Sequence, residues 1–407
     1  MKRIVVVGGG HAAAQFCASM IESKEDIQLL LVSDEAHLPY QRPPLSKTYL
    51  KDDAPEAALL RAASYYADHN VAVRLGGKVA DIDRASQTIG LEGGERIPYD
   101  VLVLATGTRA RTLPLFEGGH ANVFTLRTLD DAARLRERLQ SAQNLLVVGG
   151  GFIGLEIAAT SAQLGKSVTL LEAAPRLLGR SSSPEVSAYL LEKHRAAGVD
   201  IRVQTAIDRV DVQGEAVKGV WVGNEYLPVD VIVVGIGAVP NDDLARQAGL
   251  ACDNGVVVDA HMRTSDPAIL AIGDCTAFPS AALGRRIRLE SVQNANDQAR
   301  CAALTVTGKP APYTALPWFW SDQGAVRIQI AGVPEQDHVR VVRGDPSQGK
   351  FSVLYFEGDV LTSVESINAA ADHIAARKLI TARTPIPMER AADPAIPLKD
   401  VAASTAA

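Results

Sequence analysis

The sequence predicts an α/β protein with two doubly wound domains and a smaller C-terminal α+β domain. Apolar runs of Val, Ile and Leu end in glycine-rich loops at Gly8 and again at Gly149, and a segment with helical patterning follows each loop. After about residue 312, short segments alternate between apolar and polar residues instead. We therefore expect parallel sheets in the first two parts and a mixed domain at the end.

Each glycine-rich loop has the spacing of a dinucleotide-binding turn. The first glycine permits the tight turn, the second lets backbone approach the pyrophosphate, and the third small residue lets the helix pack on the strand. The helix N-terminus then offers N–H groups and a partial positive charge. Two such loops imply that two dinucleotides bind at once. In chain order these positions are Gly8, Gly10 and Ala13, and then Gly149, Gly151 and Gly154.

A second apolar strand follows each loop and ends in an acid. The first ends at Asp34 and Glu35, and the second ends at Glu172. A carboxylate at this place accepts hydrogen bonds from ribose hydroxyls, so Glu172 favours NADH over NADPH. Arg176 lies close behind Glu172 and would weaken this preference if it reached a 2′-phosphate.

Composition and charge narrow the class of protein. Of the 407 residues, 47% are hydrophobic and 22% are charged, which is ordinary for a soluble globular chain. The net charge of −6 argues against nucleic acid as a partner, and no apolar run is long enough to cross a membrane. Because the first strand begins at Ile4, we expect no signal peptide and a cytoplasmic location.

The four cysteines have neither redox-pair nor metal-ligand spacing, so we predict no metal site. We interpret all four as buried apolar side chains. They are Cys17, Cys252, Cys275 and Cys301.

Breaks in the pattern set the predicted domain boundaries. A first dinucleotide-binding domain comprises 1–112 and 245–312, a second comprises 113–244, and the C-terminal domain is 313–407. The last stretch, 391–407, is rich in Ala and Pro and is predicted to fray at its end. Helices are predicted at 130–140, 184–197, 292–306 and 369–377.

Six segments together resemble one family, the FAD-dependent, NADH-using ferredoxin reductases of bacterial P450 and ring-hydroxylating dioxygenase systems. That family has the glutathione-reductase-like fold, with two Rossmann-type domains. The resemblance implies FAD and NADH as cofactors and a [2Fe–2S] ferredoxin as acceptor, which supplies a cytochrome P450 or an oxygenase. We expect a monomer or weak dimer. The segments are PYQRPPLSK at 39–47, LATGT at 104–108, GGGFIGLE at 149–156, AIGDC at 271–275, RLESVQNAN at 288–296 and WFWSDQ at 318–323.

The resemblance also implies which residues bind each cofactor. Among the flavin contacts, it implies that the backbone near Val79 meets adenine, Asp274 bonds the ribityl chain and the Val292 backbone meets the pyrimidine edge. The FAD positions are Gly8, Gly10, His11, Ala12, Asp34, Glu35, Arg42, Lys47, Val79, Ala105, Thr106, Gly107, Arg127, Gly273, Asp274, Ser291, Val292 and Trp320. The NADH positions are Gly149, Gly151, Phe152, Ile153, Gly154, Glu156, Glu172, Arg180 and Gly237.

Three of these residues are the candidate catalytic set, and each has an ordinary alternative. Lys47 follows a proline-braced loop that would aim it at flavin N5, or it is a surface lysine. Glu156 would orient the nicotinamide amide and pair with Lys47, or it only stabilises a helix start. Trp320 would bound the flavin site, or it is a core aromatic.

Ser291 has the features of an N-cap whose helix points its N–H groups at the electron-rich edge of a flavin. The alternative is a capped helix without a ligand.

Because ferredoxins are acidic, we expect a basic docking patch on this chain. Its candidates are Arg109, Arg111, Arg377 and Lys378. The alternative is that these residues are ordinary solvated surface charge.

Two other functions remain open beside ferredoxin reduction. A flavin disulfide reductase or peroxide-reducing NADH oxidase needs a redox cysteine at the flavin face, and none lies between Asp34 and Lys47. A redox-sensing interaction protein of the apoptosis-inducing-factor type would share both nucleotides, but the chain lacks a targeting segment or basic tail.

Overall fold

The computed structural model describes residues 1–401, which form two compact units. Unit 2 holds both the predicted second domain and the predicted C-terminal domain, and the boundary between those two stays a prediction. Unit 1 comprises Met1–Arg42, Glu56–Arg109 and Ala238–Ala315, and unit 2 comprises Pro43–Pro55, Ala110–Gly237 and the chain from Leu316 onward.

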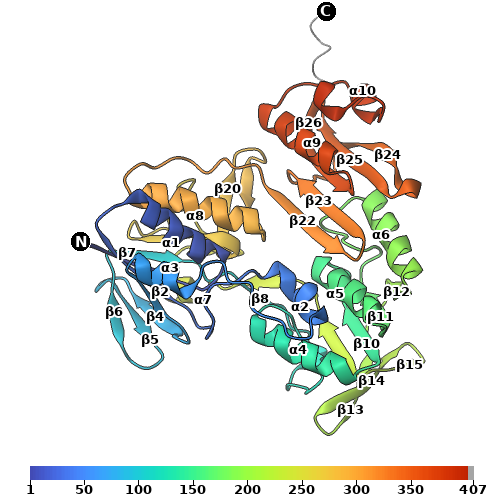
Figure 1. The fold of residues 1–407 in the computed structure, drawn as a ribbon, viewed down its shortest axis with the longest axis horizontal. Helices are drawn as coiled ribbons and strands as arrows, with labels where there is room; N and C mark the ends of the chain where they lie inside the picture. The colour runs from blue at the N-terminus through green and yellow to red at the C-terminus, as the bar shows by residue number, and fades with distance from the viewer. Residues whose placement is uncertain (402–407) are drawn as a thin grey trace, which may run out of the picture. The chain divides into compact units, whose positions relative to one another are not determined.

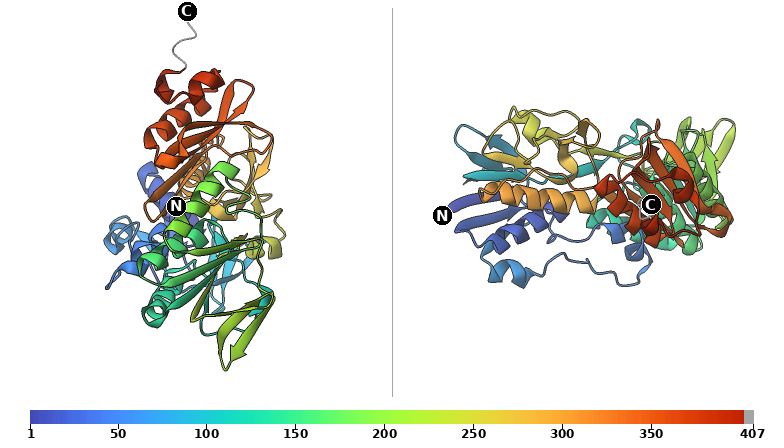
Figure 2. Two further views of the ribbon diagram at one scale, coloured as in Figure 1. Left: turned by 90° about the vertical axis from the view of Figure 1, so that its right-hand side faces the viewer. Right: turned by 90° about the horizontal axis from the view of Figure 1, so that it is seen from above.

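Unit 1 is built on a parallel five-stranded sheet in the order β19-β7-β1-β2-β3. Its central strands consist almost entirely of Val, Ile and Leu, as a sheet covered on both faces requires. Helices α1 and α8 lie side by side (Figures 1 and 2). The elements are β1 (Lys2–Val7), α1 (His11–Ser23), β2 (Ile27–Val32), β3 (Val71–Arg74), β7 (Val101–Leu104), β19 (Ile269–Ala271) and α8 (Val292–Val306).

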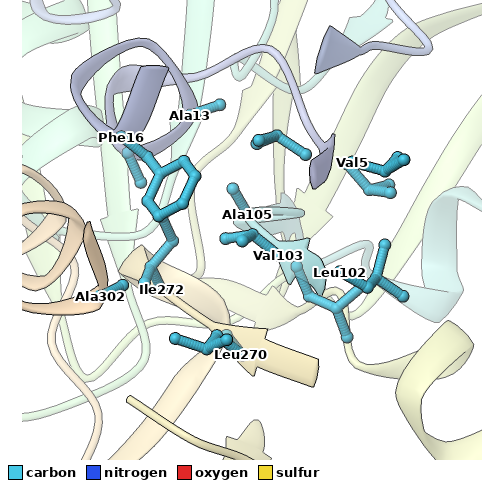
Figure 3. Close-up of a cluster of buried hydrophobic side chains, with 14 of the residues drawn as sticks. Val5, Ala13, Phe16, Leu102, Val103, Ala105, Leu270, Ile272 and Ala302 are labelled. Atoms are coloured by element: carbon cyan, nitrogen blue, oxygen red, sulfur yellow. The ribbon is translucent and has the colours of Figure 1, made fainter. Parts of the chain in front are cut away.

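The core of unit 1 lies between this sheet and these two helices. Phe16 of α1 and Ala302 of α8 belong to the same buried cluster as Val103 of β7 and Ile272, which follows β19 (Figure 3). Smaller elements complete the unit: α3 (Ala63–Asp68), the sheet of β4 (Val79–Asp83), β5 (Thr88–Leu91) and β6 (Arg96–Pro98), the short pair β8 (Thr108–Ala110) and β17 (Ala238–Pro240), α7 (Asp243–Gln247), and β18 (Val256–Val257), β20 (Thr276–Ser280) and β21 (Arg285–Ile287).

Unit 2 contains a second parallel sheet in the order β12-β11-β10-β16-β9. Its glycine loop joins β10 to α5, which repeats the arrangement of β1 and α1 in unit 1. The elements are α2 (Thr48–Lys51), β9 (Val123–Phe124), α4 (Leu129–Ser141), β10 (Asn144–Val148), α5 (Phe152–Gln163), β11 (Ser167–Glu172), α6 (Pro184–Ala196), β12 (Asp200–Val203), β16 (Val231–Val234) and the antiparallel β13 (Arg209–Gln213), β14 (Ala216–Val222) and β15 (Glu225–Pro228).

The last part of unit 2 is an antiparallel sheet in the order β22-β23-β26-β25-β24, with α9 packed on it. Strand β22 runs beside α5 (Figure 1), and the rings of Phe152 and Phe319 meet there with centroids 4.5 Å apart. The elements are β22 (Trp318–Gln323), β23 (Val326–Ala331), β24 (Val339–Asp345), β25 (Lys350–Glu357), β26 (Val360–Ile367), α9 (Ala370–Ala382) and α10 (Met388–Ala392).

One prediction about the C-terminal segment needs correction. Helix α9 continues past the predicted end at Arg377 to Ala382, because Leu379 and Ile380 are buried and extend its apolar face. The described part of the following stretch is packed, since Leu398 and Val401 are buried in the same core as α9. The end of that stretch, 402–407, where fraying is predicted, lies outside the described residues.

No helix among residues 1–401 has the length and apolar character needed to cross a membrane. Within the same described range, no group of His, Cys, Asp or Glu is arranged to hold a metal ion.

Candidate dinucleotide-binding sites

The first glycine of each loop is required by the protein's own packing. Gly8 and Gly149 have φ angles of +129° and +108°. A Cβ on Gly8 would lie 2.2 Å from the carbonyl oxygen of Ala105, and one on Gly149 would lie 2.6 Å from that of Gly235. Gly154 allows close helix–strand packing, because its Cβ would lie 2.1 Å from the Gly149 oxygen.

The second glycine of each loop borders open space. A Cβ on Gly10 would meet no atom within 4 Å, and a Cβ on Gly151 would meet only the Gly235 oxygen, at 3.7 Å. Packing within the chain therefore does not require glycine at these positions. A bare backbone next to open space is what a pyrophosphate needs, so both loops fit a dinucleotide.

The helices after these loops, like α9, start without a side-chain cap, whereas α4, α6 and α8 have one. Helices α1 and α5 begin at Gly10 and Gly151 without a side-chain cap. Side chains cap α4, α6 and α8, at Thr128, Ser183 and Ser291. The uncapped ends leave backbone N–H groups in place for phosphate oxygens.

The acids after β2 have different environments. Glu35 accepts a hydrogen bond from the Tyr40 hydroxyl at 2.5 Å and forms an ion pair with Arg42 at 2.5 Å. Burial opposes the charge of Arg42, yet Tyr40 and Glu35 beside it raise its pKa above the usual value. Asp34 is exposed. Of the two acids, Asp34 is therefore the better candidate for a ribose, and Glu35 holds Arg42 in place.

Glu172 is fixed at the end of β11 by two backbone donors. Its Oε2 accepts from the N–H of Gly150 at 2.6 Å, and its Oε1 accepts from the N–H of Ala174 at 2.7 Å. Each carboxylate oxygen retains lone pairs for ribose hydroxyls. The guanidinium of Arg176 donates instead to the carbonyl oxygens of Ser182 and Gly179, at 2.5 and 2.8 Å. Arg176 thus braces its own loop.

Two further NADH candidates lie near each other at the edge of the second sheet. The Nη2 atom of Arg180 lies 3.9 Å from the position of a Cβ on Gly237, where φ is +110°. Arg180 is exposed, and so is Ile153 at the start of α5.

Lys47 and Glu156 form a buried ion pair in unit 2. Lys47 Nζ lies 2.6 Å from Glu156 Oε2, and the two side chains are 19% and 5% exposed. The hydroxyl of Ser46 donates to the same oxygen at 2.5 Å, and the hydroxyl of Ser321 donates to Oε1 at 2.7 Å. The alternative of a surface lysine is therefore wrong, and the predicted pairing of Lys47 with Glu156 is confirmed.

The remaining FAD candidates of unit 1 line the ends of the parallel sheet. Thr106 donates to the Asn241 carbonyl at 2.7 Å, and Gly107 accepts from the Asn241 N–H at 2.9 Å. A Cβ on Gly273 would lie 3.0 Å from Cβ of Ala12, so these two FAD candidates meet. Asp274 follows in a half-buried turn.

The predicted cap of α8 is confirmed, because the Ser291 hydroxyl accepts from the N–H of Asn294 at 3.1 Å, and Val292 is the first residue of the helix. Val79 has a buried side chain in β4, which leaves only its backbone for a contact. Arg127 lies in unit 2, and its N–H donates to the Asp131 carboxylate at 3.1 Å.

Trp320 lies on a half-buried aromatic surface of unit 2. Its ring centroid is 5.6 Å from that of Trp318, and the Arg377 guanidinium lies over the Trp318 ring at 4.7 Å. Both tryptophans are half-buried, and Trp318 packs against the hydrophobic core of the C-terminal sheet. Lys378 is exposed on the same helix as Arg377. By contrast, Arg109 forms an ion pair with Asp243 at 2.8 Å.

Three of the cysteines are buried as predicted. Burial raises the pKa of Cys17 to about 12 and the pKa of Cys301 to about 11, and it also raises the pKa of Cys275. These thiols therefore resist forming the reactive thiolate. The prediction for Cys252 is wrong, since its side chain is only half-buried at the end of a loop.

Two family models match the chain. The first is described as pyridine nucleotide-disulphide oxidoreductase and matches residues 2–299, and the second is described as reductase C-terminal and matches 318–402. The chain belongs to the pyridine nucleotide-disulphide oxidoreductase family. Both the predicted family resemblance and the predicted fold class are confirmed.

This oxidoreductase is similar to ferredoxin reductases along nearly its whole length. It is 42% identical to rhodocoxin reductase from Rhodococcus erythropolis over 97% of the chain and 93% of that protein. A solved covalent complex of putidaredoxin reductase with putidaredoxin has a TM-score of 0.96, 40% identity and coverage of 100% and 99%. A ferredoxin reductase from Rhodopseudomonas palustris has a TM-score of 0.95, 40% identity and coverage of 99% and 100%.

The sequence did not identify two hydroxyl groups at the centre of the oxidoreductase's buried pair. Ser46 and Ser321 both bond Glu156, and both lie in segments that resemble the family, next to Lys47 and close to Trp320. Their position in those segments was the available signal. A serine hydroxyl next to a candidate catalytic residue has no pattern of its own that separates it from a solvated one.

Proposed function

We propose that this oxidoreductase transfers electrons from NADH through FAD to a [2Fe–2S] ferredoxin that supplies a cytochrome P450 or a ring-hydroxylating oxygenase. The near-full-length similarity to three ferredoxin reductases carries the proposal. Bound FAD supplies the conversion from a two-electron donor to a one-electron acceptor, and the protein supplies binding, orientation and electrostatics.

FAD binding is assigned first to the loop at Gly10, the uncapped start of α1 and the exposed carboxylate of Asp34. The open space beside Gly10 supports this assignment. The other proposed FAD contacts are Gly8, His11, Ala12, Arg42, Lys47, Val79, Ala105, Thr106, Gly107, Arg127, Gly273, Asp274, Ser291, Val292 and Trp320. We also propose a division of the chain into three domains. They are an FAD domain (1–112 and 245–312), an NAD domain (113–244) and a C-terminal domain (313–407).

NADH binding is assigned to the loop at Gly151, with Glu172 as the ribose acceptor. The fixed carboxylate of Glu172 and the occupied guanidinium of Arg176 support NADH rather than NADPH. Glu156 orients the nicotinamide amide, and Lys47 balances the buried charge of Glu156. The other proposed contacts are Gly149, Phe152, Ile153, Gly154, Arg180 and Gly237.

A disulfide reductase of the same family is a weaker candidate for this chain. The loop between Asp34 and Lys47 contains no cysteine. The two buried cysteines of unit 1 nearest the proposed FAD segments, Cys17 and Cys275, have raised pKa values because of burial, which disfavours a nucleophilic thiolate.

The ferredoxin partner is acidic, so its docking surface on this chain is proposed around basic groups next to aromatic rings. The exposed Lys378 and the half-buried Arg377 and Trp318 provide such groups on α9 and β22. A cytoplasmic location and a monomer or weak dimer belong to the same proposal.

Steady-state reduction of cytochrome c by NADH, with and without a [2Fe–2S] ferredoxin, tests this function. Strong dependence of the rate on added ferredoxin is the expected result. If the rate of NADH oxidation does not depend on ferredoxin but rises with an added disulfide or peroxide, a reductase of that substrate is favoured. Slow turnover with every acceptor would favour a redox-sensing interaction protein.

A further inference from the structure

A line of buried polar side chains in unit 2 ends at Glu156. Nε2 of His194 lies 2.9 Å from Oε1 of Gln323, and Nε2 of Gln323 lies 3.3 Å from Oγ of Ser321. The Ser321 hydroxyl then lies 2.7 Å from Oε1 of Glu156. All four residues are at most 4% exposed. The line joins three elements, since His194 is on α6, Gln323 and Ser321 are on β22, and Glu156 is on α5.

The hydrogen-bonding capacity of each group fixes the direction of this line. Both oxygens of Glu156 act as acceptors: Oε2 accepts from Lys47 Nζ and the Ser46 hydroxyl, and Oε1 accepts from the Ser321 hydroxyl. Ser321 has one proton and donates it to Glu156. Its oxygen can then only accept, so the amide nitrogen of Gln323 must face it.

The orientation of Gln323 also determines which nitrogen of His194 carries a proton. With its amide nitrogen turned to Ser321, Gln323 presents its carbonyl oxygen to His194. His194 must therefore carry a proton on Nε2. Burial lowers the pKa of His194, which keeps the ring neutral with a single N–H. Every donor in the line thus points toward Glu156.

Hydrogen bonds arranged in one direction polarise one another, and they act more strongly where water is excluded. We propose that His194, Gln323 and Ser321 are positioning residues that act through Glu156, holding its carboxylate at a fixed angle for the nicotinamide. The proposal rests on the function proposed for Glu156. The proposal gives a role to His194, which lies on α6 and outside both glycine loops.

The first test reads the line directly, without turnover. In the full-length protein, ring ¹⁵N chemical shifts of His194 near neutral pH should show a neutral imidazole protonated on Nε2. Gln323→Leu removes the acceptor and should alter those shifts. A His194 protonated on Nδ1 alone, or on both nitrogens, would overturn the assigned direction.

The second test measures whether the line acts through Glu156. In stopped flow with the FAD-loaded protein and saturating NADH, His194→Phe should slow flavin reduction by about three- to tenfold, the range for loss of one buried hydrogen bond. His194→Gln keeps a donor near the Nε2 position and should restore most of the rate. His338→Phe is the matched control, because His338 bonds Thr362 instead.

A double-mutant cycle decides the outcome. In a Glu156→Gln background, His194→Phe should cause no further loss, because the group it acts through has gone. An equal loss in both backgrounds, or an unchanged rate with intact FAD content, would overturn the proposal. Wild-type flavin that NADH does not reduce would instead refute the proposed function, and the ¹⁵N shifts would still decide on the line.

Discussion

The ammonium nitrogen of Lys47 lies 2.6 Å from a carboxylate oxygen of Glu156 in the interior of unit 2. Two charges out of water are tolerated only where each is paired and hydrogen-bonded. Ser46 and Ser321 complete the set of donors to Glu156. A helix-start acid that only stabilised its helix would not need three partners from outside the helix.

Breaking this pair from one side should destabilise the protein. Lys47→Met leaves Glu156 buried with an uncompensated charge, and we expect a loss of about 2 kcal/mol in the free energy of unfolding, less than for a fully buried pair because Lys47 retains some exposure. The double variant Lys47→Met/Glu156→Gln should recover most of it. Chemical denaturation measures both.

Lys78→Met is the matched control, because Lys78 pairs with Glu92 at a site where both side chains are more than half exposed. Its loss should be much smaller than that of the Lys47 variant, because solvent screens an exposed pair. Equal losses for the Lys47 and Lys78 variants would contradict the energetic account of the buried pair.

Two glycines of the same loop should respond in opposite ways to alanine. Gly10→Ala places a methyl group in open space, so stability should stay within about 0.5 kcal/mol of wild type, while FAD binding should weaken by about tenfold, or about 1.4 kcal/mol. Gly8→Ala should instead cost about 2 kcal/mol or more in folding, because of its positive φ and the nearby Ala105 oxygen.

FAD titration and thermal unfolding separate these two effects. Full FAD affinity in Gly10→Ala would contradict the assignment of the pyrophosphate to this loop. Normal stability in Gly8→Ala would contradict the backbone geometry.

Local patterns in the sequence predicted the fold well. The helix at 292–306 and its cap at Ser291 were predicted correctly because each depends on neighbouring residues alone. Contacts between distant segments were predicted less well. Ser321 and Glu156 are 165 positions apart, and only the folded chain places β22 beside α5. The exposure of Cys252 likewise depends on how its loop packs, which residue type does not determine.

The chain should prefer NADH to NADPH. If Glu172 is the ribose acceptor as proposed, its fixed carboxylate would repel a 2′-phosphate, and Arg176 donates to backbone carbonyl oxygens instead. We expect kcat/KM for NADH to exceed that for NADPH by about tenfold or more, since like charges repel there. Glu172→Ala should reduce the ratio, whereas Arg176→Ala should not raise it. A wild type that uses NADPH equally well would refute the assigned role of Glu172.

His373 should make the protein sensitive to mild acid. Its ring is 1% exposed, and burial, aided by Arg377, lowers its pKa from 6.5 to about 4. As pH falls below 6.5 the unfolded chain takes up the proton first, so stability decreases until about pH 4, by about 3 kcal/mol in all.

Chemical denaturation across this pH range checks the prediction. His373→Leu should flatten the pH dependence, and His69→Leu, at an exposed histidine, should leave it unchanged. An unaltered pH dependence in His373→Leu would show that other groups cause it.

Reversing charge on α9 should slow ferredoxin association. Lys378→Glu places a negative charge on α9 at the residue after Arg377, and we expect the association rate to fall by about threefold at low salt and to approach wild type at high salt. Lys218→Glu is the control, at an exposed position on β14. Equal effects of the two variants would point to net charge rather than a docking surface on α9.

A single chain that binds FAD and NADH together should pass electrons from NADH to the flavin and then to ferredoxin. Anaerobic stopped-flow absorbance of the FAD-reconstituted protein, mixed with NADH and then with oxidised ferredoxin, follows both steps. The expected result is a yellow protein that NADH bleaches and that ferredoxin returns to yellow. A colourless protein that takes up no FAD, or a yellow one that NADH leaves unchanged, would contradict it.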